Sequence, residues 1–221
     1  MTDYAALYRE SRARITTLVR AASARQRAAV VPGCPDWSVA DTVAHLAAVA
    51  AEALDGRLTG IPTEEQTAAQ VAQRRGRELG EVLAEWDRVG DAVEQAITAH
   101  VMPLAAVHDV LTHEADLRGA LSAGRPPRTA WTASLDTMTR HMHHLNQCGT
   151  LIVHTGEHPY RVGSGAPETA VEVDPYEFWR ALVGRRSRAQ MAAWRWSGDP
   201  APYLRALPVF GPTEADLTEP E

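Results

Sequence analysis

Apolar side chains recur at helical spacing in four successive segments within the first 120 residues. The first and third segments cover residues 4–29 and 63–100, and both also carry many Arg and Glu side chains. The fourth continues from Pro103 to Leu121. The second has the clearest pattern, with apolar positions three or four residues apart at Val39, Val43, Leu46, Ala50 and Leu54. Four helices of this length, with no convincing strand among them, predict a four-helix bundle.

Local signals indicate where these helices begin and where they weaken. Ser38 precedes the second segment and can cap it, and Asp41, three residues later, can return the hydrogen bond. Pro103 suits the first turn of the fourth helix, where a missing N–H leaves nothing unsatisfied. Gly76 and Gly80 make a weak point in the third segment, because glycine is a poor helix former.

The stretch from Gly124 to Pro127 is the best domain boundary, since glycine and proline interrupt regular structure. We therefore expect a helix bundle over residues 1–124 and a small α+β domain over residues 125–221, which makes the fold mainly α. In the second domain the pattern predicts helices over 132–148 and 174–196, with short strands at 150–153, 160–162 and 170–173 between them. The acidic tail after Gly211 is expected to fray.

The composition excludes several classes of partner. The net charge is -6, and all 22 basic residues are Arg, so neither nucleic acid nor an anionic membrane is an expected partner. The two cysteines, Cys34 and Cys148, do not form a CxxC pair and are expected to be reduced thiols. The N-terminus lacks the basic start and apolar run of a signal peptide. We expect a cytoplasmic protein that is a monomer or a homodimer.

Candidate chemistry lies in the fourth segment, where Asp109 and His113 are four residues apart. Residues at this spacing share one face of a helix, so a carboxylate and an imidazole can meet one metal ion. Asp116 follows one turn later and can orient His113. His45 in the second segment is the natural third ligand, and three protein ligands leave coordination positions open for catalysis. The alternative is an ordinary solvated helix face, because these side chains lie off the apolar stripes of their helices.

Three longer motifs resemble one known family. The segment from Val31 to Leu46 contains Cys34-Pro-Asp-Trp37 ahead of His45, and it is similar to the N-terminal signature of mycothiol-dependent maleylpyruvate isomerases. The segment Asp109 to Leu117 resembles their second signature, and the stretches 184–199 and 210–212 resemble their C-terminal end. This resemblance implies a DinB-like bundle with one divalent metal ion on His45, Asp109 and His113. The family pattern has Glu where this chain has Asp109.

The resemblance also implies a function. It predicts a zinc- and mycothiol-dependent isomerase or thiol transferase that acts on a small electrophilic substrate, with a low-molecular-weight thiol as partner. Coordination to Zn²⁺ would deprotonate the thiol, whose ordinary pKa is near 8.5, and hold a nucleophilic sulfur in place. Two alternatives remain open from the sequence, a non-catalytic metal- or ligand-binding protein and a metal-dependent hydrolase.

Two further groups of residues have competing interpretations. Cys34 lies beside a helix start, where thiols can be activated, but we expect it to pack within the turn that enters the second helix. An isomerase of this type would need cationic partners for a dicarboxylate substrate, and the Arg side chains near the motifs are Arg118, Arg185, Arg186 and Arg188. Arg is also this chain's only basic surface residue apart from His, so no arginine is assigned to the site.

Overall fold

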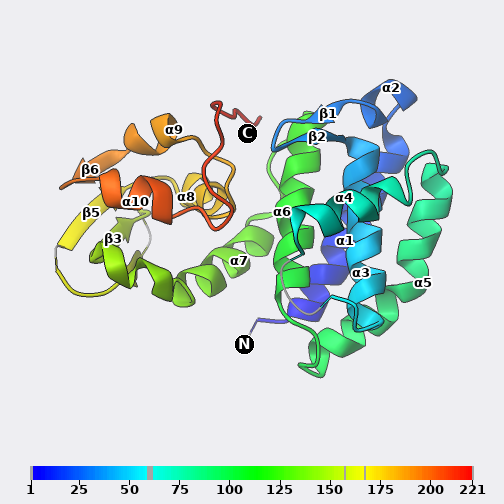
Figure 1. Ribbon diagram of the computed structural model, residues 1–221, viewed down its shortest axis with the longest axis horizontal. Coiled ribbons are helices and arrows are strands. Elements are labelled where there is room, and N and C mark those ends of the chain that lie inside the picture. The colour runs from blue at the N-terminus through cyan, green and yellow to red at the C-terminus, as the bar shows by residue number, and fades with distance from the viewer. Residues whose placement is uncertain (1, 59–61, 157, 167, 221) are drawn as a thin grey trace. The chain divides into compact units, whose positions relative to one another are not determined.

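The computed structural model describes residues 2–58, 62–156, 158–166 and 168–220 (Figure 1). The chain forms two compact units, one of Met1–Pro126 with Glu219–Glu221 and the other of Pro127–Thr218. The functional assignment of residues 1–124 as a metal-binding domain and 125–221 as a C-terminal domain stays a prediction. Within the described residues, no helix combines the length and apolar character that spanning a bilayer requires.

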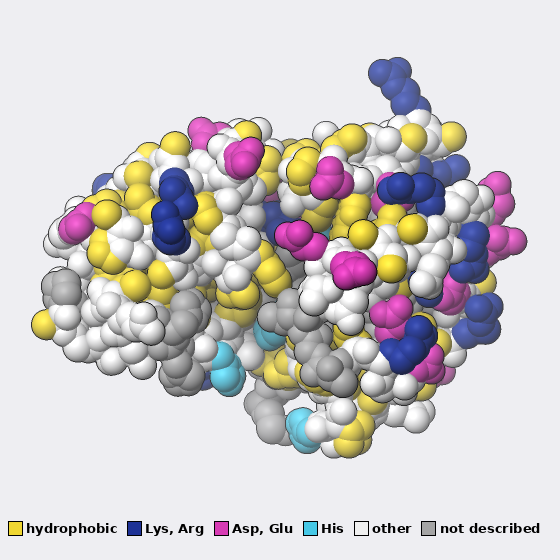
Figure 2. Space-filling model, in the orientation of Figure 1, with side chains coloured by type: hydrophobic (Ala, Val, Ile, Leu, Met, Phe, Trp, Pro, Cys, Tyr) yellow, Lys and Arg dark blue, Asp and Glu magenta, His cyan; other side chains and the backbone are white. Residues whose placement is uncertain are grey.

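Long helices build the first unit, and the four that surround its core are α1 (Tyr4–Ala21), α3 (Val39–Leu54), α5 (Leu79–Thr98) and α6 (Ala105–Ala120). The helix α1 packs against α5 and α6, and α3 packs against the same two helices (Figure 1). Ile15, Val43, Val93 and Leu117 are each completely buried between them. The predicted four-helix bundle is confirmed. Figure 2 shows Arg and acidic side chains interspersed over this unit, in keeping with its mixed charge.

Two of the predicted helices are shorter than the apolar pattern indicated. The first ends at Ala21, and a separate short helix, α2 (Ala24–Arg27), follows Ser23. The third is divided into α4 (Glu64–Ala72) and α5 by a turn in which Gly76 has φ 86°. A left-handed backbone of this kind is accessible to glycine at little energetic cost, so the chain turns between α4 and α5 at the weak point that the sequence indicated.

A small hairpin precedes α3, and the sequence pattern did not predict it. Its strands are β1 (Val30–Val31) and β2 (Cys34–Ser38), which pair in antiparallel fashion. Strands this short carry too few residues to show an alternating pattern. The hairpin ends where α3 begins, so it places Cys34 and Trp37 directly before the most buried helix of the bundle.

The start of α3 has the predicted capping box. The Ser38 hydroxyl oxygen accepts a hydrogen bond from the Asp41 backbone N–H at 3.1 Å, and the Asp41 carboxylate accepts one from the Ser38 N–H at 3.0 Å. Burial raises the pKa of Asp41, but the Ser38 hydrogen bonds and Arg75 outweigh it and lower that pKa overall. Residues 42–50 of α3 are all buried, so this cap fixes the register of a helix that is in contact with protein on every side.

The second unit has the expected α+β composition. It begins with α7 (Arg128–Arg140) and the 3₁₀ helix η1 (His143–Cys148). Its four-stranded sheet has the order β4-β3-β5-β6, in which β3 and β5 are parallel and the other pairs are antiparallel. The strands are β3 (Thr150–His154), β4 (Pro159–Gly163), β5 (Glu168–Glu172) and β6 (Arg195–Ser197). The helices α8 (Pro175–Leu182), α9 (Arg188–Ala192) and α10 (Ala201–Ala206) complete the unit.

Three sequence expectations for this unit are wrong. The predicted helix over 132–148 changes to η1 after Arg140, and the one over 174–196 ends at Leu182 and resumes only as α9. Gly184 has φ 72°, a left-handed conformation that ends the helix and turns the chain. A Cβ at this position would clash with the Gly211 carbonyl oxygen, so glycine is required here. The tail is also anchored, because Gln190 Nε2 donates to the Leu217 carbonyl oxygen at 2.7 Å.

We predict that Ser38→Ala lowers the free energy of unfolding by about 1 kcal/mol, because the Asp41 backbone N–H loses its capping acceptor and the Asp41 carboxylate loses the Ser38 hydroxyl as a donor. Urea unfolding followed by circular dichroism measures this loss. Ser23→Ala is the matched control, because Ser23 forms the same capping box on α2, a four-residue helix with no buried residue. Equal losses of unfolding free energy in the two variants would show that the capping box of α3 contributes no more to stability than that of α2.

Candidate metal centre

Two neighbouring helices bring the three predicted ligands together. His45 lies on α3, and Asp109 and His113 lie on α6. His45 Nε2 is 3.3 Å from Asp109 Oδ2, and His113 Nε2 is 3.5 Å from Asp109 Oδ1. One ligand atom from each residue lies within 4.8 Å of the others. We call this group of His45, Asp109 and His113 the first triangle.

The first triangle is buried rather than solvated. The His45 and His113 side chains are 3% and 7% exposed, and that of Asp109 is 28% exposed. The alternative interpretation, an exposed polar helix face, is therefore wrong for both histidines. That interpretation assumed a helix that is buried along one apolar stripe only. The helix α6 is packed against α1, α3 and β1, and all of residues 110–117 are buried.

The tautomer of His45 follows from its hydrogen-bond partners. Gln70, on α4, is 1% exposed, and its Oε1 lies 2.9 Å from His45 Nδ1. Its Nε2 donates to Glu52 Oε2 at 2.6 Å, and an ionised carboxylate can only accept, so the amide orientation is fixed. The Gln70 oxygen must then accept from His45 Nδ1–H. This leaves Nε2, which faces Asp109, as the ring nitrogen that a metal ion can use.

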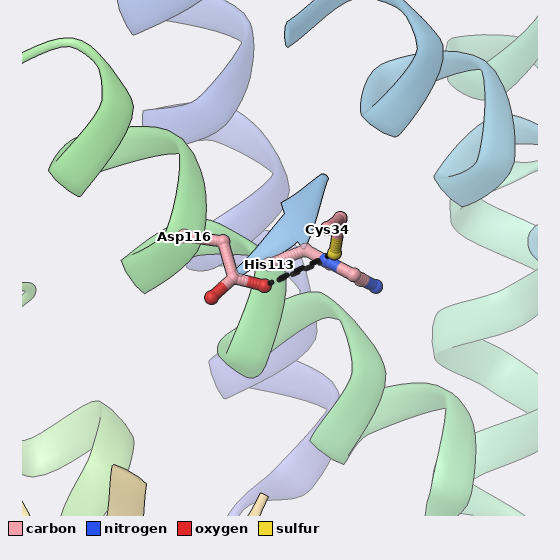
Figure 3. A group of neighbouring side chains, drawn as sticks. All are labelled: Cys34, His113 and Asp116. Carbon is pink, nitrogen blue, oxygen red and sulfur yellow. Dashed lines mark hydrogen bonds and ion pairs between the residues drawn. The ribbon is translucent and has the colours of Figure 1, made fainter. Parts of the chain in front are cut away.

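His113 has an acidic neighbour on each side of its ring. While Nε2 faces Asp109, Nδ1 lies 3.0 Å from Asp116 Oδ2 (Figure 3). The Asp116 side chain is completely buried, and the predicted contact between Asp116 and His113 is present. A carboxylate beside Nδ1 favours the proton on that nitrogen, which directs the lone pair of Nε2 into the first triangle.

The charges of the first triangle require a cation. Burial raises the pKa of Asp109, but His45 and His113 oppose it and hold that pKa far below its usual range. Burial likewise lowers the pKa of His113, whereas Asp109 and Asp116 raise it well above the ordinary value. Asp109 Oδ2 is buried and accepts no well-directed hydrogen bond from any described residue. A carboxylate with this surrounding is stable only beside positive charge, either a proton shared with histidine or a metal ion.

The geometry fits a small divalent metal ion. Nitrogen and oxygen ligands at about 2.0–2.1 Å from a tetrahedral zinc ion are separated by about 3.3 Å. The separations of 3.3 and 3.5 Å, one to each oxygen of Asp109, are close to that edge length. The two Nε2 atoms and an oxygen of Asp109, all within 4.8 Å of one another, are therefore a donor set whose chemistry and spacing suit a zinc ion. Asp109 reaches this position although its side chain is shorter than the Glu of the resembled pattern.

An aromatic ring and a small pocket border the first triangle. The ring of Trp37, from β2, lies 4.8 Å from that of His45 and 6.0 Å from that of His113, measured between centroids. Asp109 also lines a pocket with apolar neighbours that include Tyr8 and Trp86. Trp86 Nε1 donates to Tyr8 Oη at 2.8 Å, and burial raises the pKa of Tyr8 to about 12, so this hydroxyl stays protonated at neutral pH.

Sequence reasoning missed Gln70 and the position of Cys34. Gln70 lies 25 residues from His45 along the chain and carries no motif of its own, so no signal in the sequence connects the two. Cys34 Sγ lies 3.9 Å from Asp116 Oδ2, a contact across the hairpin and α6 that spacing alone cannot reveal. In the sequence, the position of Cys34 is indicated only by its place in the motif that ends at Trp37.

Two of the arginines near the motifs have structural partners. Arg118 Nε and Nη2 donate to the carbonyl oxygens of Gly124 and Ala123 at 2.9 and 2.7 Å. Arg186 is 2% exposed and pairs with Glu177. The guanidinium groups of Arg118 and Arg186 are therefore engaged in holding the fold together.

Comparison with known proteins gives a family and a fold. Residues 8–155 match the family described as mycothiol maleylpyruvate isomerase N-terminal domain. The structure resembles the crystal structure of the mycothiol-dependent maleylpyruvate isomerase, with 12% identity, a TM-score of 0.56, and coverage of 84% of this chain and 90% of that chain. A histidine-to-alanine mutant of that isomerase gives 12% identity, a TM-score of 0.55, and coverage of 89% and 93%. None of the curated proteins compared matches this sequence.

The structural likeness confirms the predicted fold class, a DinB-like bundle followed by a small α+β domain. At this level of identity it establishes the fold alone, so the chemistry depends on the residues described above.

We predict that Gln70→Ala lowers the zinc affinity about 10–100-fold, because His45 loses the partner that fixes its tautomer and ring orientation. Competition titration with a chromophoric zinc chelator measures the affinity. Gln73→Ala is the matched control, because Gln73 is an exposed glutamine at the C-cap of the same short helix.

Thermal unfolding of the metal-free variants separates stability from binding. A Gln70→Ala protein that keeps the zinc affinity of the unmodified chain would show that Gln70 only fills space.

Proposed function

This chain belongs to the mycothiol maleylpyruvate isomerase N-terminal domain family, and we propose that it is a metal- and mycothiol-dependent enzyme. Its reaction is the isomerisation of, or thiol transfer to, a small electrophilic substrate. The observation that carries the proposal is the convergence of two Nε2 lone pairs and one orphaned carboxylate oxygen in the buried first triangle. Cytoplasmic location and a monomeric or homodimeric state stay predictions from the sequence.

In this proposal His45, Asp109 and His113 hold one Zn²⁺. Imidazole nitrogen and carboxylate oxygen are ligands that zinc prefers, and three protein ligands leave a position open for an external group. A bound zinc ion would supply the Lewis acidity that converts a thiol to a thiolate near neutral pH. The single negative charge of the ligand set leaves a net positive charge at the site, which favours an anionic fourth partner.

Neighbouring side chains orient and cover the three ligands of the first triangle. Gln70 holds His45 with Nε2 directed at Asp109, and Asp116 favours the same orientation of His113. Asp109 places its two oxygens against two different histidines, so the three groups restrain one another before a ligand arrives. Trp37 covers the histidine rings and limits the access of water from the hairpin side. Ordered, partly dry ligands of this kind reduce the reorganisation that accompanies the reaction.

Both proposed reactions begin with addition of a sulfur nucleophile to the substrate. Addition followed by rotation and elimination of the same thiol gives cis–trans isomerisation, whereas loss of a different leaving group gives thiol transfer. The metal ligands play the same part in both, so they do not distinguish them. The family assignment favours isomerisation, and the first substrate to test is maleylpyruvate.

The two other functions remain distinguishable by experiment. A metal-dependent hydrolase would use water as the nucleophile and would act on esters or amides without added thiol. A non-catalytic protein would hold the metal ion and show no turnover with any of these substrates. We favour the thiol-dependent enzyme because the matched family takes its name from a mycothiol-dependent isomerase.

We predict that the purified chain binds about one zinc ion and that His45→Ala and His113→Ala each abolish this stoichiometric binding, since two remaining ligands hold zinc weakly. Elemental analysis after dialysis measures the metal content. His154→Ala, at an exposed histidine outside the first triangle, is the matched control and keeps its zinc. A metal-free chain after incubation with excess Zn²⁺ would contradict the proposed site.

We predict that zinc-loaded protein isomerises maleylpyruvate only when mycothiol is present, because the nucleophile comes from the thiol. Turnover is followed by the change in ultraviolet absorbance of the substrate. Asp109→Asn is expected to lower kcat/KM at least about 100-fold, since it removes the one anionic ligand of the metal. Equal isomerisation without any thiol would overturn the thiol-dependent proposal, and hydrolysis of an ester or amide without thiol would favour the hydrolase.

A further inference from the structure

A second group of ligand atoms lies on the opposite side of His113. It consists of Cys34 Sγ, His113 Nδ1 and Asp116 Oδ2, and we call it the second triangle (Figure 3). Cys34 comes from β2, whereas the other two residues lie one turn apart on α6. All three ligand atoms lie within 4.8 Å of one another. The imidazole of His113 is therefore shared, with Nε2 in the first triangle and Nδ1 in the second.

The second triangle has the dimensions of a metal site that contains sulfur. Tetrahedral zinc with a sulfur ligand at about 2.3 Å and an oxygen or nitrogen ligand at about 2.0 Å gives ligand separations of about 3.5 Å for S–O and about 3.3 Å for N–O. The structure has 3.9 Å between Cys34 Sγ and Asp116 Oδ2, and 3.0 Å between His113 Nδ1 and Asp116 Oδ2. These two separations are within about half an ångström of the values for one shared ion, and Cys34 Sγ and His113 Nδ1 lie within 4.8 Å of each other.

His113 Nδ1 is the buried ring nitrogen that faces this triangle. His113 is 5% exposed, and its Nδ1 lies 3.0 Å from Asp116 Oδ2 in an ion pair whose geometry is not that of a well-directed hydrogen bond. A buried ring nitrogen needs a group that uses its lone pair or its proton. In the absence of a metal ion Asp116 meets this need, and a cation between Nδ1, the carboxylate and the sulfur would bind the same nitrogen through its lone pair.

We propose that Cys34, His113 and Asp116 form a second coordination position for a thiophilic divalent cation, and that a metal ion in either triangle excludes one from the other. A neutral imidazole has a single lone pair. When Nδ1 binds a metal ion, the proton must lie on Nε2, whose N–H then points at Asp109 and removes one ligand from the first triangle. The exclusion rests on the proposed function, whereas the second position does not.

Charge and softness set which cation the second triangle takes. A thiolate and a carboxylate together neutralise a divalent ion, so the occupied site carries no net charge in its buried surroundings. The first triangle contains only nitrogen and oxygen ligands, whereas the second contains sulfur, which binds softer cations more strongly. The second position is therefore selective for ions such as Cd²⁺ over harder ions, and its occupancy inhibits the enzyme by taking His113 away from the first triangle.

Cadmium titration tests the second position directly, because thiolate coordination gives an ultraviolet charge-transfer band. In His45→Ala, which lacks the first triangle, we expect one Cd²⁺ per chain together with this band. The double variant His45→Ala/Cys34→Ser is expected to lose the band and to bind Cd²⁺ at least about tenfold more weakly. His45→Ala/Cys148→Ser is the matched control, because Cys148 is the other cysteine and is partly buried to a similar degree, and it keeps the band.

The outcomes separate the two proposals. A folded His45→Ala chain with no thiolate band, or a band that disappears with Cys148 and not with Cys34, overturns the second position and leaves the first intact. Zinc bound stoichiometrically to the unmodified chain is expected to suppress the cadmium band, and simultaneous binding of one Zn²⁺ and one thiolate-bound Cd²⁺ overturns the exclusion. Failure of the unmodified chain to bind zinc overturns the proposed function and the exclusion that rests on it, whereas the second position is still decided by the cadmium band of His45→Ala. Circular dichroism establishes that each variant is folded.

Discussion

The burial of charged and polar side chains within a helix bundle is the constraint on which this structure depends. The helix α6 carries Asp109, His113, Glu114 and Asp116 at positions in contact with protein on several sides, and each needs a partner to offset the loss of water. Glu114 obtains its partners from α1, where Arg14 Nε and Ser11 Oγ donate to its carboxylate at 2.6 and 2.7 Å. These bonds fix α1 against α6. The packing of the bundle and the arrangement of its ligands are thus consequences of the same requirement.

The same requirement explains why the short elements matter. The helix α4 is only nine residues long, yet it supplies Gln70 to His45. The hairpin of β1 and β2 is shorter still, yet it supplies both Trp37 and Cys34 to the neighbourhood of His113. Neither element adds a large apolar face to the core. Their part in the structure is to satisfy and cover groups that the long helices bury.

The sequence predicted what local patterns determine. The capping box of Ser38 and Asp41 is a contact over three residues, and the pair Asp109 and His113 follows from the pitch of one helix. The proximity of His45 to that pair required the family resemblance, because no local rule sets α3 beside α6. Gly76 marked a weak point in the third segment from its residue type alone, whereas the place of Gln70 depends on a contact between elements distant in sequence. The helical-wheel argument failed for His45 and His113 because it assumes one buried stripe, and these helices are covered on several sides.

The identity of the group behind His45 has a consequence for how protons move. Gln70 is an amide, so it can neither take up nor release a proton near neutral pH, and its orientation is set by Glu52. Gln70 therefore cannot relay a proton to or from His45 Nδ1. His113 differs, because each of its ring nitrogens faces a carboxylate that can accept a proton, so side-chain proton transfer is open to His113 and closed at His45 Nδ1.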